Sequence, residues 1–445
     1  MDPAARPQPS VRRAIGTAES LDTLLERVAS VLERVEQSRR TRSSERGTPP
    51  SDRAGRVVDE LVHRALAAGV PVRVDIQSTR PGSGSTAEAV LQVRATIPLV
   101  FKMDEKPKLL DEARVLQRIQ QRSDLPVSFR QRFPRVFAVR DQDGYAYVME
   151  EFLESEGYSG SERAFFSNGG SGIALEQDAV RLVNAVCDAL FEGYVESVNP
   201  RLRPSLYADY VQRIADRLAA AGKRDEDFAS LPVLVLAHRR EYKPWQQYVD
   251  VLSAHREEIE HLAPPFVTFV HGDPNPENVL VAIGQTGINV RFIDVKEWQD
   301  GDYLFDMTKL HHYLAVTAPM ELIPGAGTAT SHRDGDRVVI KHRCEPPSWL
   351  DAVEAVLRRR VSQFAAHPDA ASHDAEPDLE WESRWQLGMA SNLLGLPDNR
   401  LAKGRRPAAL AMYAEGLTNI SMTSVRVGDG SNGFGSNWPA LARWS

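Results

Sequence analysis

The residues of this sequence best suited to chemistry are two aspartates and an asparagine: Asp273, Asn278 and Asp294. Each adjoins a short apolar run typical of a strand: FVTFV precedes Asp273, VLVAI follows Asn278, and INVRFID ends at Asp294. Strand ends can converge, so we expect these side chains to lie together. Their oxygens suit a hydrated divalent cation, Mg²⁺ above all, or Asp273 could orient or deprotonate a hydroxyl. Singly they would be ordinary turn residues, but the ordered set favours a site.

Upstream, a lysine and a glutamate form a second candidate group. Lys102 interrupts the apolar pattern of PLVFKMD, where a lysine is costly unless it has an anionic partner. Glu112 lies near the apolar stripe of a helix predicted over 106–121. A strand lysine held by a helix glutamate is the ion pair that phosphate positioning needs, although an edge lysine and a surface glutamate would fit the same pattern. The preceding turn PGSGST, residues 81–86, could be an anion cradle or a flexible hairpin.

The elements that must position these residues change character along the chain. Residues 1–56 combine an amphipathic helix (20–36) with an Arg-, Ser- and Pro-rich linker, interpreted as a solvated tether although its arginines could touch an acidic partner. Residues 57–153 predict a helix at 57–69 and then an antiparallel sheet of about five strands with one internal helix. The strands are VRVDIQST, AEAVLQVRA, PLVFKMD, FPRVFAVRD and GYAYVMEEF, the last two joined by an Asp143-Gly144 turn.

Residues 154–445 predict a mainly helical region after a Gly- and Ser-rich loop at 155–172. A hairpin is expected at 327–343, turning at RDGD, and the glycine-rich tail from 428 is expected to be poorly ordered in part. The fold class is therefore α+β. Helices are predicted at 174–195, 205–221, 243–261, 303–316, 348–365, 380–395 and near 407–417.

Composition narrows the function classes. The chain of 445 residues has 54 basic and 61 acidic side chains, a net charge of −7, which argues against a general nucleic-acid binder. Its two cysteines, Cys187 and Cys344, rule out a disulfide framework and are expected to be reduced, inert thiols of a cytoplasmic protein. The N-terminal stretch shows no secretory h-region, and no apolar run is long enough to predict a membrane span.

The stretch HGDPNPENVL, followed by FIDVKEWQDGDYLFDMTKL, resembles the aminoglycoside phosphotransferase and choline kinase family of small-molecule kinases. That pattern is H-G-D, four residues, N, then an I-D ending a strand, then G-D and a further D. The matching positions here are His271, Gly272, Asp273, Asn278, Ile293, Asp294, Gly301, Asp302 and Asp306. The resemblance covers about residues 57–420. It implies a protein-kinase-like two-lobe fold, with an N-lobe at 57–153, a mainly helical C-lobe at 154–445 and residues 1–56 as a helical extension.

The resemblance also implies roles for individual residues in the transfer of a phosphoryl group from ATP, with Mg²⁺, to a small-molecule hydroxyl. Asp273 would be the catalytic base or hydroxyl-orienting acid, and Asn278 and Asp294 would hold Mg²⁺. Lys102, fixed by Glu112, would bind the α- and β-phosphates. Asp302 and Asp306 would support the catalytic loop. The remaining nucleotide-binding positions would be Gly82, Ser83, Gly84 and Ser85 over the phosphates, and Met149, Glu150 and Phe152 around the adenine.

Two other classes of protein share part of this pattern. A protein kinase would need a long activation segment after Asp294, but GDYLFDMTKLHHYLAV runs straight into a helix, which favours a small acceptor. A catalytically inactive, kinase-like regulatory module is the alternative, disfavoured because every expected catalytic position is present. The sequence departs from the family at Pro274-Asn275, where Leu and His are frequent, and at Val295-Lys296, where Trp-Glu is frequent, which bears on substrate choice.

The acceptor is predicted only as a class: a sugar, an aminoglycoside or a similar compound. The acidic residues near 369–382 could serve a cationic aminoglycoside or form a solvated acidic loop. His311, His312 and the 327–343 hairpin occupy positions where family members build the acceptor pocket. The sequence GDYLFDMTKL is closer to that of family members associated with sugar or surface-polysaccharide pathways than to that of resistance enzymes. The acidic residues concerned are Asp369, Asp374, Glu376, Asp378, Glu380 and Glu382.

Overall fold

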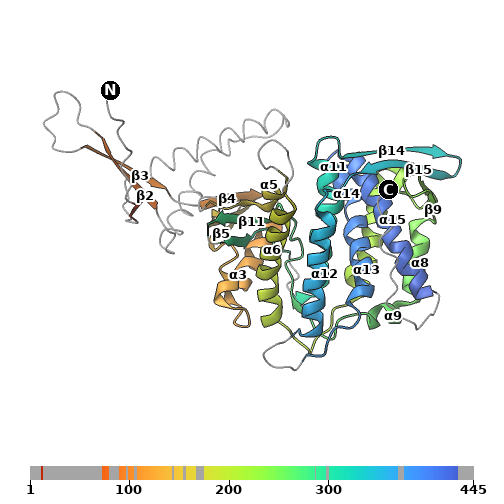
Figure 1. The fold of residues 1–445 in the computed structure, drawn as a ribbon, viewed down its shortest axis with the longest axis horizontal. Helices are drawn as coiled ribbons and strands as arrows, with labels where there is room; N and C mark the ends of the chain where they lie inside the picture. Colours follow the sequence, from red (N-terminus) through yellow and green to blue (C-terminus); the bar gives the residue numbers. More distant parts are fainter. Residues whose placement is uncertain are drawn as a thin grey trace. The chain divides into compact units, whose positions relative to one another are not determined.

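The computed structural model describes residues 12–13, 73–79, 90–96, 99–104, 108–142, 145–153, 157–166, 175–285, 287–296, 300–368 and 375–428 (Figure 1). Several expectations fall outside these ranges: the helices at 20–36 and 57–69, the linker after the first of them, the PGSGST turn, the Asp143-Gly144 turn, Asp369, Asp374 and the tail from 429. The chain forms two compact units. The first holds the chain up to Arg122 and Phe133–Tyr158, and the second holds Ser123–Arg132 and the chain from Ser159.

The first unit contains the predicted strands, in two ladders. β4 (Leu99–Asp104), β6 (Tyr145–Glu151) and β5 (Val136–Gln142) form an antiparallel sheet with β6 at its centre, and helix α3 (Lys108–Gln121) packs on it. β2 (Arg73–Thr79) and β3 (Val90–Thr96) pair with each other and with β1 (Arg12–Arg13). The prediction of one sheet is therefore wrong for the described strands.

β6 is the central strand of its sheet. Its five inner residues, 146–150, are all buried, and it pairs with β4 along one edge and with β5 along the other. The α3 face that packs on this sheet carries Leu109 and Ala113, which contact Ala146 and Val148. This small core holds α3 against the sheet whose strand β4 carries Lys102.

A row of helices forms the body of the second unit. α6 (Glu176–Glu196), α12 (Leu350–Ala366), α13 (Trp381–Leu394) and α15 (Arg406–Gly428) pack in this order (Figure 1). Their apolar stripes are buried between neighbours. α13 and α15 approach closely because Gly416 has no side chain: a Cβ there would lie 2.4 Å from the Leu394 side chain.

Other helices of the second unit differ from the predictions in detail. The predicted helix 205–221 starts as a π-helical turn, η3 (Tyr207–Gln212), before α7 (Arg213–Arg224). The helix predicted at 243–261 is broken at His255, and the one at 303–316 becomes π-helical after His312. The segments are α8 (Trp245–Ala254), α9 (Arg256–His261), α10 (Tyr303–His312), η5 (Tyr313–Thr317), α11 (Ala318–Glu321), α14 (Pro397–Ala402), α4 (Val127–Arg130) and η4 (Glu226–Phe228).

The predicted loop at 155–172 contains a short strand and a helix, which corrects the expectation. β7 (Ser159–Gly160) pairs with β11 (Val279–Gly284), and α5 (Ser161–Phe166) follows at once. Phe165 and Phe166 are buried and both contact Trp349, and this burial outweighs the glycine-rich composition around them.

The predicted hairpin is confirmed as β14 (Gly327–Asp334) and β15 (Arg337–Cys344). Two strands that the sequence did not predict, β8 (Val233–Val235) and β9 (Arg240–Tyr242), extend it to the order β14-β15-β8-β9. Each is three residues long, too short for a recognisable alternation. Cys187 and Cys344 are buried, and burial raises the pKa of each thiol to about 12, in accord with inert thiols. In the described part of the chain, no helix has the length and apolar character needed to cross a membrane.

Candidate active site

The HGDPNPEN segment forms a loop after β10 (Thr268–Phe269). This loop is held by a side chain of α10, Asp306. The Asp306 carboxylate accepts the backbone N–H of His271 at 2.7 Å and that of Gly272 at 2.8 Å. The hydroxyl of Tyr194 donates to the same carboxylate at 2.9 Å. Gly272 has φ of 79°, a conformation that favours glycine. Asp306 thus satisfies two backbone donors of a turn that would otherwise be buried and unpaired.

Asp273 lies between two lysines. Lys296 Nζ lies 3.1 Å from one carboxylate oxygen, and Lys309 Nζ lies 3.4 Å from the other. The Asn275 amide donates to this carboxylate at 2.8 Å. Burial opposes the charge of Asp273, but the charges of Lys309 and Lys296 outweigh it and hold the pKa of this carboxyl well below its usual range. Asp273 is therefore an ionised, oriented carboxylate.

The sequence does not predict the two lysines beside Asp273; Lys296 stands out there only as a departure from the family. Lys309 lies on α10 and is buried, and burial lowers its pKa to about 8. A signal existed, because a lysine among Met307, Thr308 and Leu310 is as anomalous as the lysine in PLVFKMD. Lys296 has no such pattern around it, and only the fold brings it to Asp273.

Asn278 and Asp294 are brought together by the pairing of β11 with β12 (Gly287–Phe292). Val279 faces Phe292 in this ladder, and the next contact is the Ile293 N–H donating to the Asn278 carbonyl at 3.0 Å. The Asn278 side-chain nitrogen donates to the Asp273 carbonyl at 2.9 Å. The predicted convergence of the strand ends is therefore seen at these positions.

These positions fit the requirements of a divalent cation. The Asn278 amide nitrogen is used by the loop, so the amide is oriented with its oxygen available as a ligand. Asp294 has φ of 57°, in the left-handed region that is uncommon for residues other than glycine, although Asp adopts it more often than most. Backbone strain of this kind clusters at functional sites.

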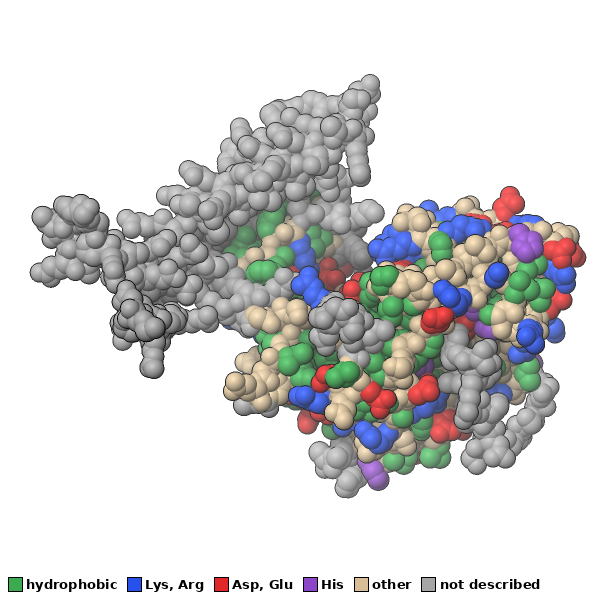
Figure 2. Space-filling model, turned by 45° about the horizontal axis from the view of Figure 1, so that its top comes forward, with side chains coloured by type: hydrophobic (Ala, Val, Ile, Leu, Met, Phe, Trp, Pro, Cys, Tyr) green, Lys and Arg blue, Asp and Glu red, His purple; other side chains and the backbone are tan. Residues whose placement is uncertain are grey.

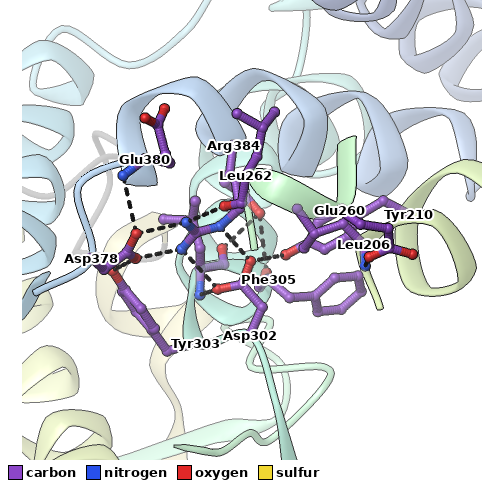
Figure 3. A network of polar contacts seen from close by, with 12 residues as sticks. Leu206, Tyr210, Glu260, Leu262, Asp302, Tyr303, Phe305, Asp378, Glu380 and Arg384 are labelled. Atoms are coloured by element: carbon purple, nitrogen blue, oxygen red, sulfur yellow. Dashed lines mark hydrogen bonds and ion pairs between the residues drawn. The ribbon is translucent and has the colours of Figure 1, made fainter. Parts of the chain in front are cut away.

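A second buried network fixes the start of α10 (Figure 3). Arg384 on α13 donates to Asp302 at 2.9 Å and to Asp378 at 2.5 Å, and also to the Leu262 carbonyl at 2.8 Å. Asp302 caps α10 by accepting the N–H of Leu304. The Asp302 and Asp306 carboxylates are therefore engaged with protein groups, in accord with the expected supporting roles.

The acidic segment near 376–382 is not the simple solvated loop that the composition suggested. Asp378 is buried between Arg384 and the Tyr303 hydroxyl, which donates to it at 2.7 Å. Glu376 and Glu382 are exposed. On the face shown in Figure 2, acidic side chains are interspersed with basic ones over the described surface. Asp378 is thus a structural anion and not a member of a cation-binding patch.

In the first unit, Lys102 forms the predicted ion pair and an additional one. Its Nζ lies 2.5 Å from Glu112 Oε1 and 2.7 Å from Glu150 Oε1. The second contact follows from the ladder, in which Val100 faces Glu150, so Lys102 is the diagonal neighbour. Burial opposes the lysine charge, but the charges of Glu150 and Glu112 outweigh it and raise its pKa. The Glu150 side chain was not expected to take part in this ion pair.

The other predicted positions are placed as follows. Met149 on β6 is buried and faces Phe101, and Phe152 follows the strand and is half-buried. Gly82, Ser83, Gly84 and Ser85 lie outside the described residues. His311 and His312 are both buried; His311 lies 3.4 Å from Glu354 and against the Trp385 ring.

Comparison with known proteins places the chain in a family. The model of the phosphotransferase enzyme family matches residues 78–339, more than half of the chain. No curated protein sequence matches significantly. Among solved structures, a glucosamine kinase in complex with glucosamine, ADP and inorganic phosphate is 13% identical, with TM-score 0.44, covering 86% of this chain and 88% of that one.

Two further structures are similar at the same low level. Plasmodium vivax ethanolamine kinase is 12% identical with TM-score 0.36, covering 79% of this chain and 82% of that one. The GDP complex of an aminoglycoside 2′-phosphotransferase is 13% identical with TM-score 0.38, covering 80% and 93%. These values are too low to indicate a substrate.

The chain belongs to the phosphotransferase enzyme family, as the HGDPNPEN resemblance implied. It is a small-molecule phosphotransferase of mixed helix and sheet structure.

Proposed function

We propose that this protein transfers the γ-phosphoryl group of ATP, in a Mg²⁺-dependent reaction, to a hydroxyl of a small molecule such as a sugar. The observation that carries the proposal is the Asp273 carboxylate, fixed through its loop by Asp306 and flanked by Lys296 and Lys309. Phosphoryl transfer depends mainly on positioning and charge neutralisation. The loop positions the carboxylate, and the two lysines neutralise charge.

Asp273 acts mainly by orientation. A carboxylate whose pKa is held well below its usual range is ionised at neutral pH but is a weak base. It therefore accepts a hydrogen bond from the acceptor hydroxyl, aims the oxygen, and takes its proton late in the transfer. Lys296 and Lys309 offset the negative charge that gathers near this carboxylate.

Asn278 and Asp294 would hold the magnesium ion, whose chemistry is to neutralise charge on the phosphates. In the first unit, Lys102 would bind phosphate oxygens, oriented by Glu112 and Glu150. Gly82–Ser85, Met149 and Phe152 keep their proposed nucleotide-binding roles.

The charges around Asp273 bear on the acceptor class. Lys296 and Lys309 both contact it, at 3.1 and 3.4 Å. Two cations near the acceptor oxygen disfavour a polycationic aminoglycoside and favour a neutral or anionic hydroxyl compound. A sugar is the simplest member of that class.

The test is a coupled assay of ATP consumption over neutral sugars, amino sugars, aminoglycosides, nucleosides and amino alcohols, with wild type and Asp273→Asn. We expect turnover with one hydroxyl compound and a loss of kcat of about 10²- to 10⁴-fold in the variant, with ATP affinity unchanged. Asp351→Asn, an exposed aspartate on α12, is the matched control.

Each outcome of the assay has a clear meaning. Full turnover by Asp273→Asn would remove Asp273 from the mechanism. No ATP consumption with any acceptor would favour the inactive regulatory module. Efficient turnover of aminoglycosides alone would overturn the inference drawn from Lys296 and Lys309.

A further inference from the structure

Two histidines and a glutamate meet at the sheet and helix of the second unit, apart from the loop that carries Asp273. Nε2 of His238 lies 3.1 Å from Oε1 of Glu415, and Nε2 of His342 lies 2.9 Å from the same oxygen. The two imidazole rings are 5.2 Å apart and nearly perpendicular. The three candidate ligand atoms all lie within 4.8 Å of one another.

The three side chains come from separate elements. His238 stands in the turn between β8 and β9, His342 is on the buried face of β15, and Glu415 is on α15. α15 packs against β9, β14 and β15, so it delivers the glutamate to the sheet (Figure 1). The cluster therefore joins the C-terminal helix to the hairpin and to the β8–β9 turn.

Supporting residues orient His238 in the way that a metal-binding histidine requires. Nδ1 of His238 hydrogen-bonds the Tyr242 hydroxyl at 3.0 Å and that of Thr418 at 3.2 Å, which leaves Nε2 facing Glu415. Thr418 lies one turn after Glu415 on the same face of α15. A partner on the second ring nitrogen fixes the tautomer and aims the first nitrogen at a metal.

Burial and backbone conformation also favour a site. The His342 and Glu415 side chains are almost fully buried, at 1% and 8% exposure, whereas His238 keeps 20% and gives the cluster one open side. Arg239, next to His238, has φ of 49°, a strained conformation for a residue with a side chain. The β8–β9 turn therefore contains a strained residue directly beside the histidine that contacts Glu415.

We propose that His238, His342 and Glu415 bind a Zn²⁺ ion that ties α15 to the β14-β15-β8-β9 sheet, with a water molecule as the fourth ligand on the open side. Two imidazoles and a carboxylate are a ligand set that zinc takes with one open position. Zinc–ligand distances of about 2.0–2.2 Å place neighbouring tetrahedral ligand atoms about 3.3 Å apart. The contacts at 2.9 and 3.1 Å need only a small expansion.

The ordinary alternative is a carboxylate that accepts N–H donors from two histidines without metal. The two cases differ in a direct measurement of bound zinc. The zinc proposal does not rest on the proposed phosphoryl transfer, so either proposal can fail while the other stands.

The experiment uses the full chain, stripped with EDTA, dialysed, and titrated with Zn²⁺ in the presence of excess Mg²⁺. Metal content and the thermal unfolding midpoint are the readouts. We expect one tightly held zinc per chain and a rise in the midpoint, both abolished in Glu415→Gln. Thr418→Val should weaken binding by about 10- to 100-fold.

Two controls keep the outcome decisive. His332→Ala removes an exposed histidine of β14 outside the cluster and should bind zinc as wild type does. Asp294→Ala should also retain the zinc. The absence of tight zinc binding in the wild type, or equal binding in Glu415→Gln, would overturn the proposal. If Glu415→Gln fails to fold, Thr418→Val supplies the same comparison.

Discussion

Lys309 is a buried side chain whose pKa is set by two opposing influences. Its ammonium group lies 3.4 Å from Asp273 inside the helical body of the second unit, where a charge is costly. Burial lowers its pKa to about 8, although the Asp273 charge opposes the shift. The lysine is thus protonated at neutral pH and loses its charge just above it.

We predict that phosphoryl transfer falls as pH rises through about 8, because the protonated form of Lys309 neutralises charge near Asp273. The sign follows from the shift: below pH 8 the lysine is charged, and above it the cation is lost. The pH–rate profile of kcat should lose this descending limb in Lys309→Met, at a lower overall rate. Lys403→Met, an exposed lysine, should keep it. A wild-type profile flat to pH 9.5 would contradict the prediction.

Asp294 gives a second residue-scale prediction. If it holds the metal, Asp294→Ala should weaken ATP binding in the presence of Mg²⁺ but leave binding measured without metal little changed, because only the metal-linked part of the affinity is lost. Calorimetric titration with and without Mg²⁺ measures both. An unchanged affinity with Mg²⁺ present would argue against this role.

At the scale of the element, α10 supports the separate loop that contains Asp273. Asp302 caps its first turn, and Asp306, one turn further, accepts two backbone N–H groups of the loop. Burial raises the pKa of Asp306 to about 7, although the hydrogen bonds from His271, Gly272 and Tyr194 favour its charged form. The helix and the loop therefore form one unit of structure.

We predict that Asp306→Ala destabilises the chain by about 2–6 kcal/mol, because it leaves two buried backbone donors unpaired at about 1–3 kcal/mol each. Tyr194→Phe is the matched control: it removes a single hydroxyl donor from the same carboxylate and should cost about 1 kcal/mol. Urea unfolding gives both free energies of unfolding. Equal losses in the two variants would mean that Asp306 does not hold the loop.

At the scale of the whole molecule, Arg384 joins segments far apart in the sequence. It contacts Asp302 before α10, Asp378 before α13 and the Leu262 carbonyl after α9 (Figure 3). Two buried carboxylates surround one buried guanidinium, so the charges are compensated only while all three are present.

We predict that Arg384→Met lowers the free energy of unfolding by about 3–5 kcal/mol, because it leaves two carboxylates buried without their cation. Arg359→Met, an exposed arginine of α12, should change stability by no more than about 0.5 kcal/mol. Chemical denaturation of both variants makes the comparison. A loss below 1 kcal/mol in Arg384→Met would show that solvent reaches these carboxylates.

Much of the fold was predictable because its signals are local. The strands 99–104, 136–142 and 145–151 and the hairpin at 327–344 follow from alternation and turn residues. The predictions fail where burial by distant residues decides: α5 forms in a glycine-rich segment because its phenylalanines pack on Trp349. The assignment of five strands to one sheet also failed, since sequence spacing does not say which strands pair.

The sequence by itself predicted that the 270–278 loop and Asp294 come together, because these residues are held in order by short strands and need only local spacing to converge. It also determined the pair of Lys102 with Glu112, through a strand and the helix that follows it. Tertiary structure alone decided what surrounds them: Lys296 and Lys309 on Asp273, Glu150 on Lys102, and Asp378 on Arg384. It also assembled His238, His342 and Glu415. Contacts across such sequence distances depend on how helices and sheets pack, which no local pattern encodes.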